Sequence, residues 1–67
     1  MEIRLNGESY KLPPGVQTAE DLLHHLGIDQ RIVVMEQNRT VLEREQWKET
    51  RINVGDELEI VHFVGGG

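Results

Sequence analysis

The sequence predicts an α+β fold in which four to five strands form a mixed sheet and one main helix packs on one face. Two observations support this prediction. Apolar and polar residues alternate near both ends of the 67-residue chain, which is the period of a half-buried strand. Between these ends lies one segment with apolar residues at helical spacing. A chain this short forms one small domain, which we place at residues 1–64, followed by a flexible glycine tail at residues 65–67.

The first two predicted strands form a hairpin. Met1, Ile3 and Leu5 alternate with polar residues, as in a strand with one buried face. The Asn6-Gly7 dipeptide follows, and it suits a tight turn because both residue types tolerate positive φ. The returning strand ends at the Pro13-Pro14-Gly15 segment, since proline has no N–H to donate to a neighbouring strand.

The main helix is predicted from about Thr18 to Leu26. Thr18 and Asp21 have nearly the spacing and chemistry of a capping box, which marks a helix start. Gly27 is well placed as the left-handed residue that ends the last turn. The apolar residues of this segment fall on one face that we expect to pack against the sheet: Ala19, Leu22, Leu23 and Leu26.

The second half of the chain predicts three more strands. The continuous apolar run Ile32–Met35 is typical of a strand that is covered on both faces. We expect a turn at Gln37-Asn38 and then a short strand at Thr40–Leu42. A corner at Arg44–Trp47 and a second turn at Val54–Asp56 are expected before the last strand, which begins at Glu57. If the first strand pairs in parallel with the last, this order gives the β-grasp, or ubiquitin-like, arrangement.

Composition excludes several classes of function. The chain has no cysteine, so disulfides, thiolate nucleophiles and cysteine-based metal sites are absent. A net charge of −5 argues against binding to nucleic acid or to an anionic membrane surface, both of which attract basic faces. No apolar stretch is long enough to cross a bilayer and no signal peptide is recognisable, so we expect a cytoplasmic protein.

The closing Gly65-Gly66-Gly67 segment is the candidate reactive group. Glycine has no Cβ, so Gly65 and Gly66 can pass through a channel that would exclude other residues. Three extended residues reach at most about 10 Å beyond the last strand. The Gly67 carboxylate is ionised at neutral pH and is a poor electrophile, so it must be activated before a nucleophile can attack it.

Several segments together resemble the ThiS family of sulfur carrier proteins of thiamin biosynthesis. They are the Asn6-Gly7 hairpin, the run Ile32–Met35, the segment Arg44–Trp47, the turn Val54–Asp56 and the closing Phe63–Gly67. Arg44 and Trp47, spaced as Arg-x-x-Trp, are the most specific feature when combined with the terminal glycines. Glu43 departs from the proline expected before that arginine.

Membership of this family would imply a defined chemistry. An adenylating enzyme of the ThiF/MoeB type would consume ATP to convert the Gly67 carboxylate into an acyl-adenylate. Sulfur from a cysteine desulfurase or a sulfurtransferase would then displace AMP and leave a thiocarboxylate. The thiazole synthase ThiG would take that sulfur for thiazole formation. The chain would therefore be a protein co-substrate with no bound cofactor, rather than an enzyme.

The last strand suggests a docking surface for these partners. If Leu58, Ile60 and His62 point inward, strand alternation sends Val61 and Phe63 outward beside the tail. We therefore expect docking through Val61, Phe63 and Val64, with Glu57 and Glu59 as candidates to pair with basic residues of the adenylating enzyme. The alternative is a second buried layer or a bulge that reverses the two faces.

Other side chains that could support chemistry have simpler interpretations. His24 and His25 are neighbours on the helix and point about 100° apart, so with His62 they make no expected metal site. Trp47 is expected to cover one edge of the core. We interpret the remaining carboxylates as a solvated acidic surface rather than acid/base pairs: Glu43, Glu45, Glu49, Asp56, Glu57 and Glu59.

Three other functions stay open at this point. The same tail could be conjugated through Gly67 to lysines, as in a ubiquitin-like protein modifier. The chain could supply sulfur for molybdopterin synthesis instead of thiazole. It could also be a plain binding module whose glycine end is inert.

Overall fold

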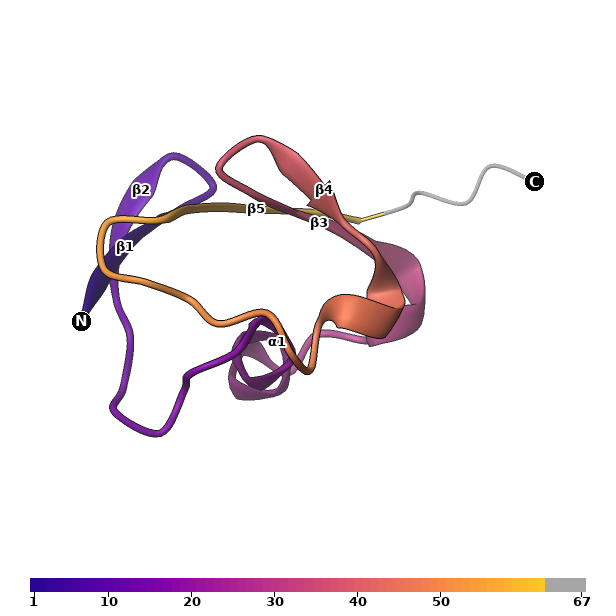
Figure 1. The fold of residues 1–67 in the computed structure, drawn as a ribbon, viewed down its shortest axis with the longest axis horizontal. Helices are drawn as coiled ribbons and strands as arrows, with labels where there is room; N and C mark the ends of the chain where they lie inside the picture. The colour runs from indigo at the N-terminus through magenta and orange to yellow at the C-terminus, as the bar shows by residue number, and fades with distance from the viewer. Residues whose placement is uncertain (63–67) are drawn as a thin grey trace.

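The computed structural model describes residues 1–62 and confirms the predicted mixed sheet with one helix on one face (Figure 1). The five strands lie in the order β2-β1-β5-β3-β4. β1 pairs in parallel with β5, whereas the other neighbouring pairs are antiparallel. In chain order the elements are β1 (Glu2–Leu5), β2 (Glu8–Lys11), α1 (Ala19–Leu26), the 3₁₀ helix η1 (Gln30–Ile32), β3 (Val33–Gln37), β4 (Thr40–Leu42), the 3₁₀ helix η2 (Arg44–Gln46) and β5 (Glu57–His62).

The local signals for the first hairpin and the helix are confirmed. Asn6 and Gly7 both have positive φ, 50° and 83°, as the tight turn requires. Before α1, the Thr18 hydroxyl accepts a hydrogen bond from the Asp21 N–H, and the Asp21 carboxylate accepts one from the Thr18 N–H, both at 3.1 Å. Gly27 ends the helix in the left-handed conformation, with φ 69°.

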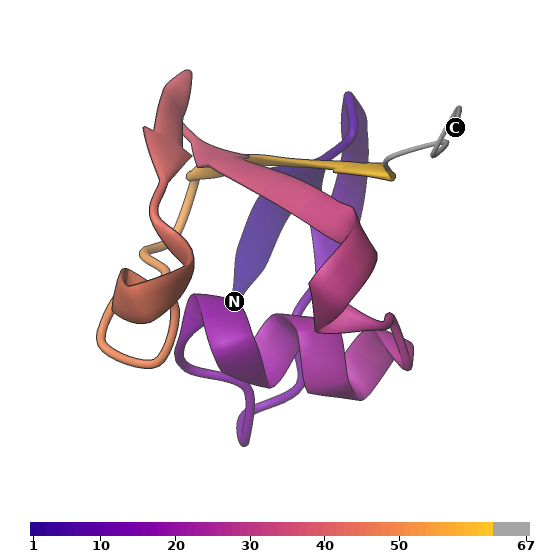
Figure 2. The same cartoon turned by 90° about the vertical axis from the view of Figure 1, so that its right-hand side faces the viewer.

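The core lies between α1 and the sheet (Figure 2). Leu22 and Leu23 of the helix are fully buried, and they share this core with strand residues such as Met35 and Leu58. Trp47 is buried as predicted, and its indole N–H donates a hydrogen bond to the Leu42 carbonyl at 3.2 Å. Within residues 1–62, no helix is long and apolar enough to span a membrane.

The prediction that the run Ile32–Met35 is covered on both faces is wrong. Ile32 belongs to η1 and its side chain is 43 % exposed, while Val34 is only half-buried on the sheet face opposite α1. One helix covers only one face of a sheet, so β3 buries alternate residues. The following turn also lies one residue later than expected, at Asn38 and Arg39, which both have positive φ.

Asp56 is also not the surface carboxylate that the sequence suggested. Only 8 % of this residue is exposed, and its carboxylate accepts hydrogen bonds from the Gln37 side chain (2.8 Å), the Asn38 side chain (3.1 Å) and the Asn53 N–H (2.8 Å). Burial opposes the charged form, but these hydrogen bonds outweigh it and lower the pKa of Asp56 below its ordinary value. Asp56 thus fastens the β3–β4 hairpin to the loop that leads into β5.

Candidate functional site

β5 precedes the candidate reactive tail in the sequence and is the middle strand of the sheet (Figure 1). Val61 points away from the helix and is 55 % exposed, as strand alternation predicted. The expectation that His62 points into the core is wrong, because its side chain is exposed at the strand end. Phe63, Val64 and the glycines Gly65, Gly66 and Gly67 lie outside the described residues, so their predicted roles are not tested by the structure.

Val61 has apolar neighbours that the sequence did not reveal. Val34 of β3 lies directly opposite Val61 on the face away from α1, which we call the open face. Val41 of β4 is 57 % exposed, and its register partner Glu36 belongs to the same face. Only the register between β3, β4 and β5 brings these valines to one side of the sheet, and residues from distant segments carry no local signal of that register.

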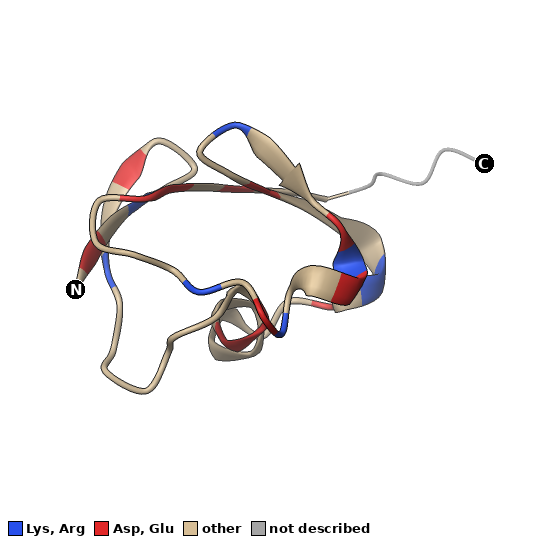
Figure 3. Cartoon of the chain, viewed as in Figure 1, with Lys and Arg blue, Asp and Glu red and all other residues tan. Residues whose placement is uncertain are grey.

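Acidic residues precede Val61 along β5, where Figure 3 marks their positions in red, and the strand register places them on the open face. Glu57 and Glu59 are both exposed on β5, and Glu36 of β3 lies directly opposite Glu59. Like charges directly opposite each other destabilise a sheet. The presence of the Glu36–Glu59 pair therefore needs a reason other than the stability of the fold. Both glutamates line a shallow pocket of about 210 Å³, to which two arginines also belong. The pocket is lined by Arg4, Gly7, Glu36, Arg39, Glu57, Leu58 and Glu59.

The two hairpin turns fix β5 from both sides through asparagine side chains. The Asn6 amide oxygen accepts a hydrogen bond from the Ile60 N–H at 2.8 Å. On the other side, the Asn38 amide oxygen accepts one from the Glu57 N–H at 3.0 Å. Both turns thereby hold the strand that leads into the tail.

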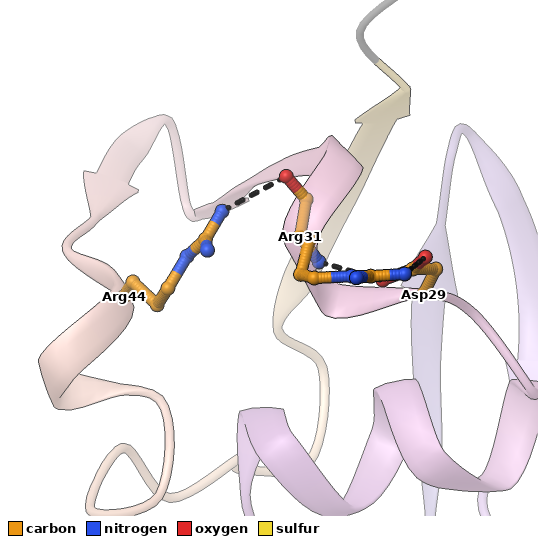
Figure 4. Close-up of polar contacts among 3 residues, drawn as sticks. All are labelled: Asp29, Arg31 and Arg44. Atoms are coloured by element: carbon orange, nitrogen blue, oxygen red, sulfur yellow. Dashed lines mark hydrogen bonds and ion pairs between the residues drawn. The ribbon is translucent and has the colours of Figure 1, made fainter.

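The Arg-x-x-Trp segment forms a polar cluster at the start of β3 (Figure 4). The Arg44 guanidinium donates a hydrogen bond to the Arg31 carbonyl at 3.2 Å and lies 5.6 Å from the centroid of the Trp47 ring. Arg31 in turn makes two side-chain hydrogen bonds to Asp29, which lower the pKa of Asp29 to about 2. Because Val33 pairs with His62, this cluster borders the end of β5.

The three histidines do not gather at one place in the described residues. His24 and His25 are exposed near the end of α1, where the His25 ring nitrogen lies 3.1 Å from the Tyr10 hydroxyl. His62 belongs to β5 on the other side of the core. Across residues 1–62, no three histidine, cysteine, aspartate or glutamate side chains come close enough to hold a metal ion.

Comparisons with known proteins match the whole chain. The ThiS family model matches residues 3–67. The sulfur carrier protein ThiS of Bacillus subtilis is 37 % identical over 65 residues, which cover 97 % of this chain and 98 % of that protein. The crystal structure of the thiamine biosynthesis protein ThiS from Geobacter metallireducens has a TM-score of 0.85 and 33 % identity, with 100 % of both chains covered.

A second group of relatives is longer. The thiazole synthase of Paramagnetospirillum magneticum is 39 % identical over 67 residues, which are 100 % of this chain but only 20 % of that protein. The thiazole synthase of Magnetococcus marinus matches with the same identity and the same coverage. The chain thus spans one fifth of these two proteins and nearly all of the Bacillus relative.

Fold, chain length and sequence therefore agree. The five-stranded sheet with one helix is shared with a solved ThiS structure over its full length, and the family match includes the glycine end. The chain belongs to the ThiS family and is a small sulfur carrier of thiamin biosynthesis, not a catalyst.

Proposed function

We propose that the carboxylate of Gly67 is the group that carries the sulfur. The observation that supports this most directly is that the family match extends through residue 67 and so includes all three closing glycines. The family's thiocarboxylate chemistry needs a terminal carboxylate. Glycine leaves that carbonyl without a neighbouring side chain, so an attacking group can approach either face.

In the proposed reaction, an adenylating enzyme of the ThiF/MoeB type binds ATP and the tail together. The Gly67 carboxylate attacks the α-phosphate, pyrophosphate leaves, and the resulting acyl-adenylate has AMP as its leaving group. A persulfide on a cysteine desulfurase or a sulfurtransferase then attacks the acyl carbon and displaces AMP, and a thiol cleaves the resulting acyl disulfide, so that the thiocarboxylate is released and the thiol is oxidised to a disulfide. Gly65 and Gly66 serve only to pass through the narrow channel that leads to the nucleotide.

The open face supplies the docking surface in this proposal. Ordering three glycines costs about 3–6 kcal/mol of backbone entropy, and these residues have no side chains to offset it. Adjacent apolar side chains must therefore contribute affinity. Val61 is well placed with Val34 and Val41, and continued strand alternation would add Phe63 to the same surface.

The acidic part of the open face can pair with basic side chains of the adenylating enzyme and so orient the docked protein. Glu36 and Glu59 lie opposite each other beside the shallow pocket, so basic side chains of the adenylating enzyme would relieve their repulsion. Glu57, by contrast, has Arg4 as its register partner on β1. We therefore assign the stronger role in pairing with the enzyme to Glu59 together with Glu36.

Thiazole synthase is the proposed acceptor of the sulfur. Two relatives that contain a segment similar to this whole chain have the name thiazole synthase, and the similar segment makes up 20 % of each. A carrier and its acceptor joined in one chain meet at a high effective concentration, which favours sulfur transfer between them. We propose that this chain serves a thiazole synthase in the same way.

The decisive experiment combines this protein with ATP and its cognate adenylating enzyme. Pyrophosphate should be released, and addition of the sulfur donor with a thiol reductant should replace one terminal oxygen by sulfur, which the mass of the intact protein reports. Deletion of Gly66 and Gly67 should abolish both events. Gly66→Val should impair them, since a β-branched side chain obstructs a narrow channel. Unchanged pyrophosphate release by the deletion variant would show that the tail is not the reactive group.

Two further measurements separate the alternative functions. Lysine-linked conjugates of the protein in cell extract would indicate a protein modifier. Deletion of the gene should create a growth requirement that thiazole satisfies, whereas a requirement for molybdopterin would assign the sulfur to the other pathway.

The deletion of Gly66 and Gly67 and the Gly66→Val substitution should both retain the melting temperature of the unaltered protein, so that a loss of activity reports on the tail alone.

A further inference from the structure

β5 extends beyond the strand that it pairs with on one side. β1 ends at Leu5, whose register partner is Leu58. Beyond that point the Asn6 side chain takes the place of a backbone: its amide oxygen accepts from the Ile60 N–H at 2.8 Å, and its amide nitrogen donates to the Ile60 carbonyl at 3.4 Å. Asn6 has φ 50°, so the chain turns away here while its side chain completes one more rung of the ladder.

The next rung on this side has no partner among the described residues. Backbone groups of alternate residues in a strand point to opposite neighbours, and those of Leu58 and Ile60 point toward β1. His62 therefore points its N–H and carbonyl to the same side. Within residues 1–62, no hydrogen bond reaches these two groups, whereas β3 covers the opposite edge of β5 as far as Val33.

We propose that this open edge of β5 at His62 binds an extended segment of thiazole synthase as an added strand. This proposal rests on the proposed partnership with that enzyme. An unpaired strand edge is a ready template for main-chain hydrogen bonds, and strand addition is a recurrent way of binding an extended segment. The edge opens at His62, where the Asn6 side chain stops, and Gly65, the first tail residue, follows three residues later in the sequence.

Strand addition also suits the chemistry of a glycine tail. Glycine has no side chain that a partner could bind, but main-chain N–H and carbonyl groups are available at every residue. A partner strand that starts at His62 would set both the direction and the register of the chain entering its active site. The two longer relatives are named thiazole synthase and include a segment similar to this chain, which is why we assign the added strand to that enzyme rather than to the adenylating enzyme.

A proline substitution tests the proposed rung. His62→Pro removes the N–H that points to the open edge and spares the ladder to β3, which uses the neighbouring Val61. His62→Ala controls for the loss of the side chain, so the comparison of the two variants reports the lost N–H together with the fixed φ of proline. We expect His62→Pro to bind thiazole synthase about tenfold more weakly than His62→Ala in titration calorimetry, as for the loss of one hydrogen bond.

Hydrogen exchange on the unaltered protein gives an independent measurement. The His62 amide should exchange fast in the free protein and slow at least about tenfold when thiazole synthase is bound, whereas the Val61 amide is already protected by β3. Equal affinities of the two variants, or an unchanged His62 exchange rate in the complex, would overturn the added strand. A defect of His62→Pro in adenylation alone would assign the edge to the adenylating enzyme. No binding of the unaltered protein would refute the partnership itself.

Discussion

Replacement of Asp56 by asparagine should destabilise the fold more than any other change that conserves side-chain shape. The Asp56 carboxylate is buried and accepts three hydrogen bonds, from Gln37, Asn38 and the Asn53 N–H. Asparagine keeps one acceptor oxygen but presents an NH₂ group in place of the other. That group would face a donor, so at least one of these three donors loses its partner.

The expected loss follows from these contacts. A hydrogen bond to a charged group contributes about 1.5–3 kcal/mol and a neutral one about 0.5–1.5 kcal/mol, so Asp56→Asn weakens two bonds and loses a third. The contributions are not additive, and we expect a net loss of about 2–4 kcal/mol. A domain of this length has a total free energy of unfolding of about 3–10 kcal/mol, so the variant should lose a large share of its stability.

The pH dependence provides a second, sharper signature. Since folding lowers the pKa of Asp56, its contribution to stability is fully present above the unfolded-state pKa of about 3.9 and is lost as pH falls through the lower folded-state value. The difference in free energy of unfolding between the unaltered protein and Asp56→Asn should therefore become smaller as pH falls below about 4. Asp21 and Asp29, whose pKa values are also lowered, are present in both proteins and cancel in this difference.

Urea unfolding followed by tryptophan fluorescence can measure both effects. Trp47 is the only tryptophan and is buried, so its emission reports on the folded core. The measurement compares the free energies of unfolding of the two proteins at pH 7 and at steps down to about pH 3. A difference below about 0.5 kcal/mol at pH 7, or one that stays constant with pH, would refute the assigned role of the Asp56 carboxylate.

Four further substitutions test the core, the turn and the open face. Leu22→Ala should cost about 2–5 kcal/mol because the side chain is fully buried, and a smaller loss in urea unfolding would place it outside the core. Asn6→Gly keeps the positive φ but loses both hydrogen bonds to β5, so stability should fall by about 1–3 kcal/mol in the same assay. Glu36→Gln should raise stability by about 0.2–1 kcal/mol by relieving repulsion from Glu59, yet slow association with the adenylating enzyme; an unchanged association rate would remove the acidic pair from the interface. Val61→Glu should weaken that binding without unfolding the protein, and a loss of circular dichroism would instead place Val61 in the core.

The short-range features of this fold were predictable from the sequence because neighbouring residues determine them. The turn at Asn6 and Gly7 depends on the positive φ that both residue types tolerate. The helix begins after Thr18 and ends before Gly27, because the capping groups lie within one turn of the backbone that they satisfy. The candidate reactive group, the Gly67 carboxylate, was likewise identified from local composition.

Pairings between remote segments could not be predicted in the same way. The sequence placed Asp56 on a solvated surface, but the Gln37 and Asn38 side chains that bind it come from the β3–β4 hairpin. Likewise, the apolar run at Ile32 indicated a strand buried on both faces. Because the described residues include only one α-helix, they leave one face of the sheet uncovered, and Ile32 is exposed.

The sequence by itself therefore determined which local elements form, and it predicted the glycine end as the candidate reactive group. Only the tertiary structure decided what surrounds β5. Within residues 1–62, it brought Val34 beside Val61, placed Glu36 opposite Glu59 and left one edge of β5 open at His62. The physical reason is that a strand's own residues set its period of two, whereas its register depends on hydrogen bonds to strands far away in the chain.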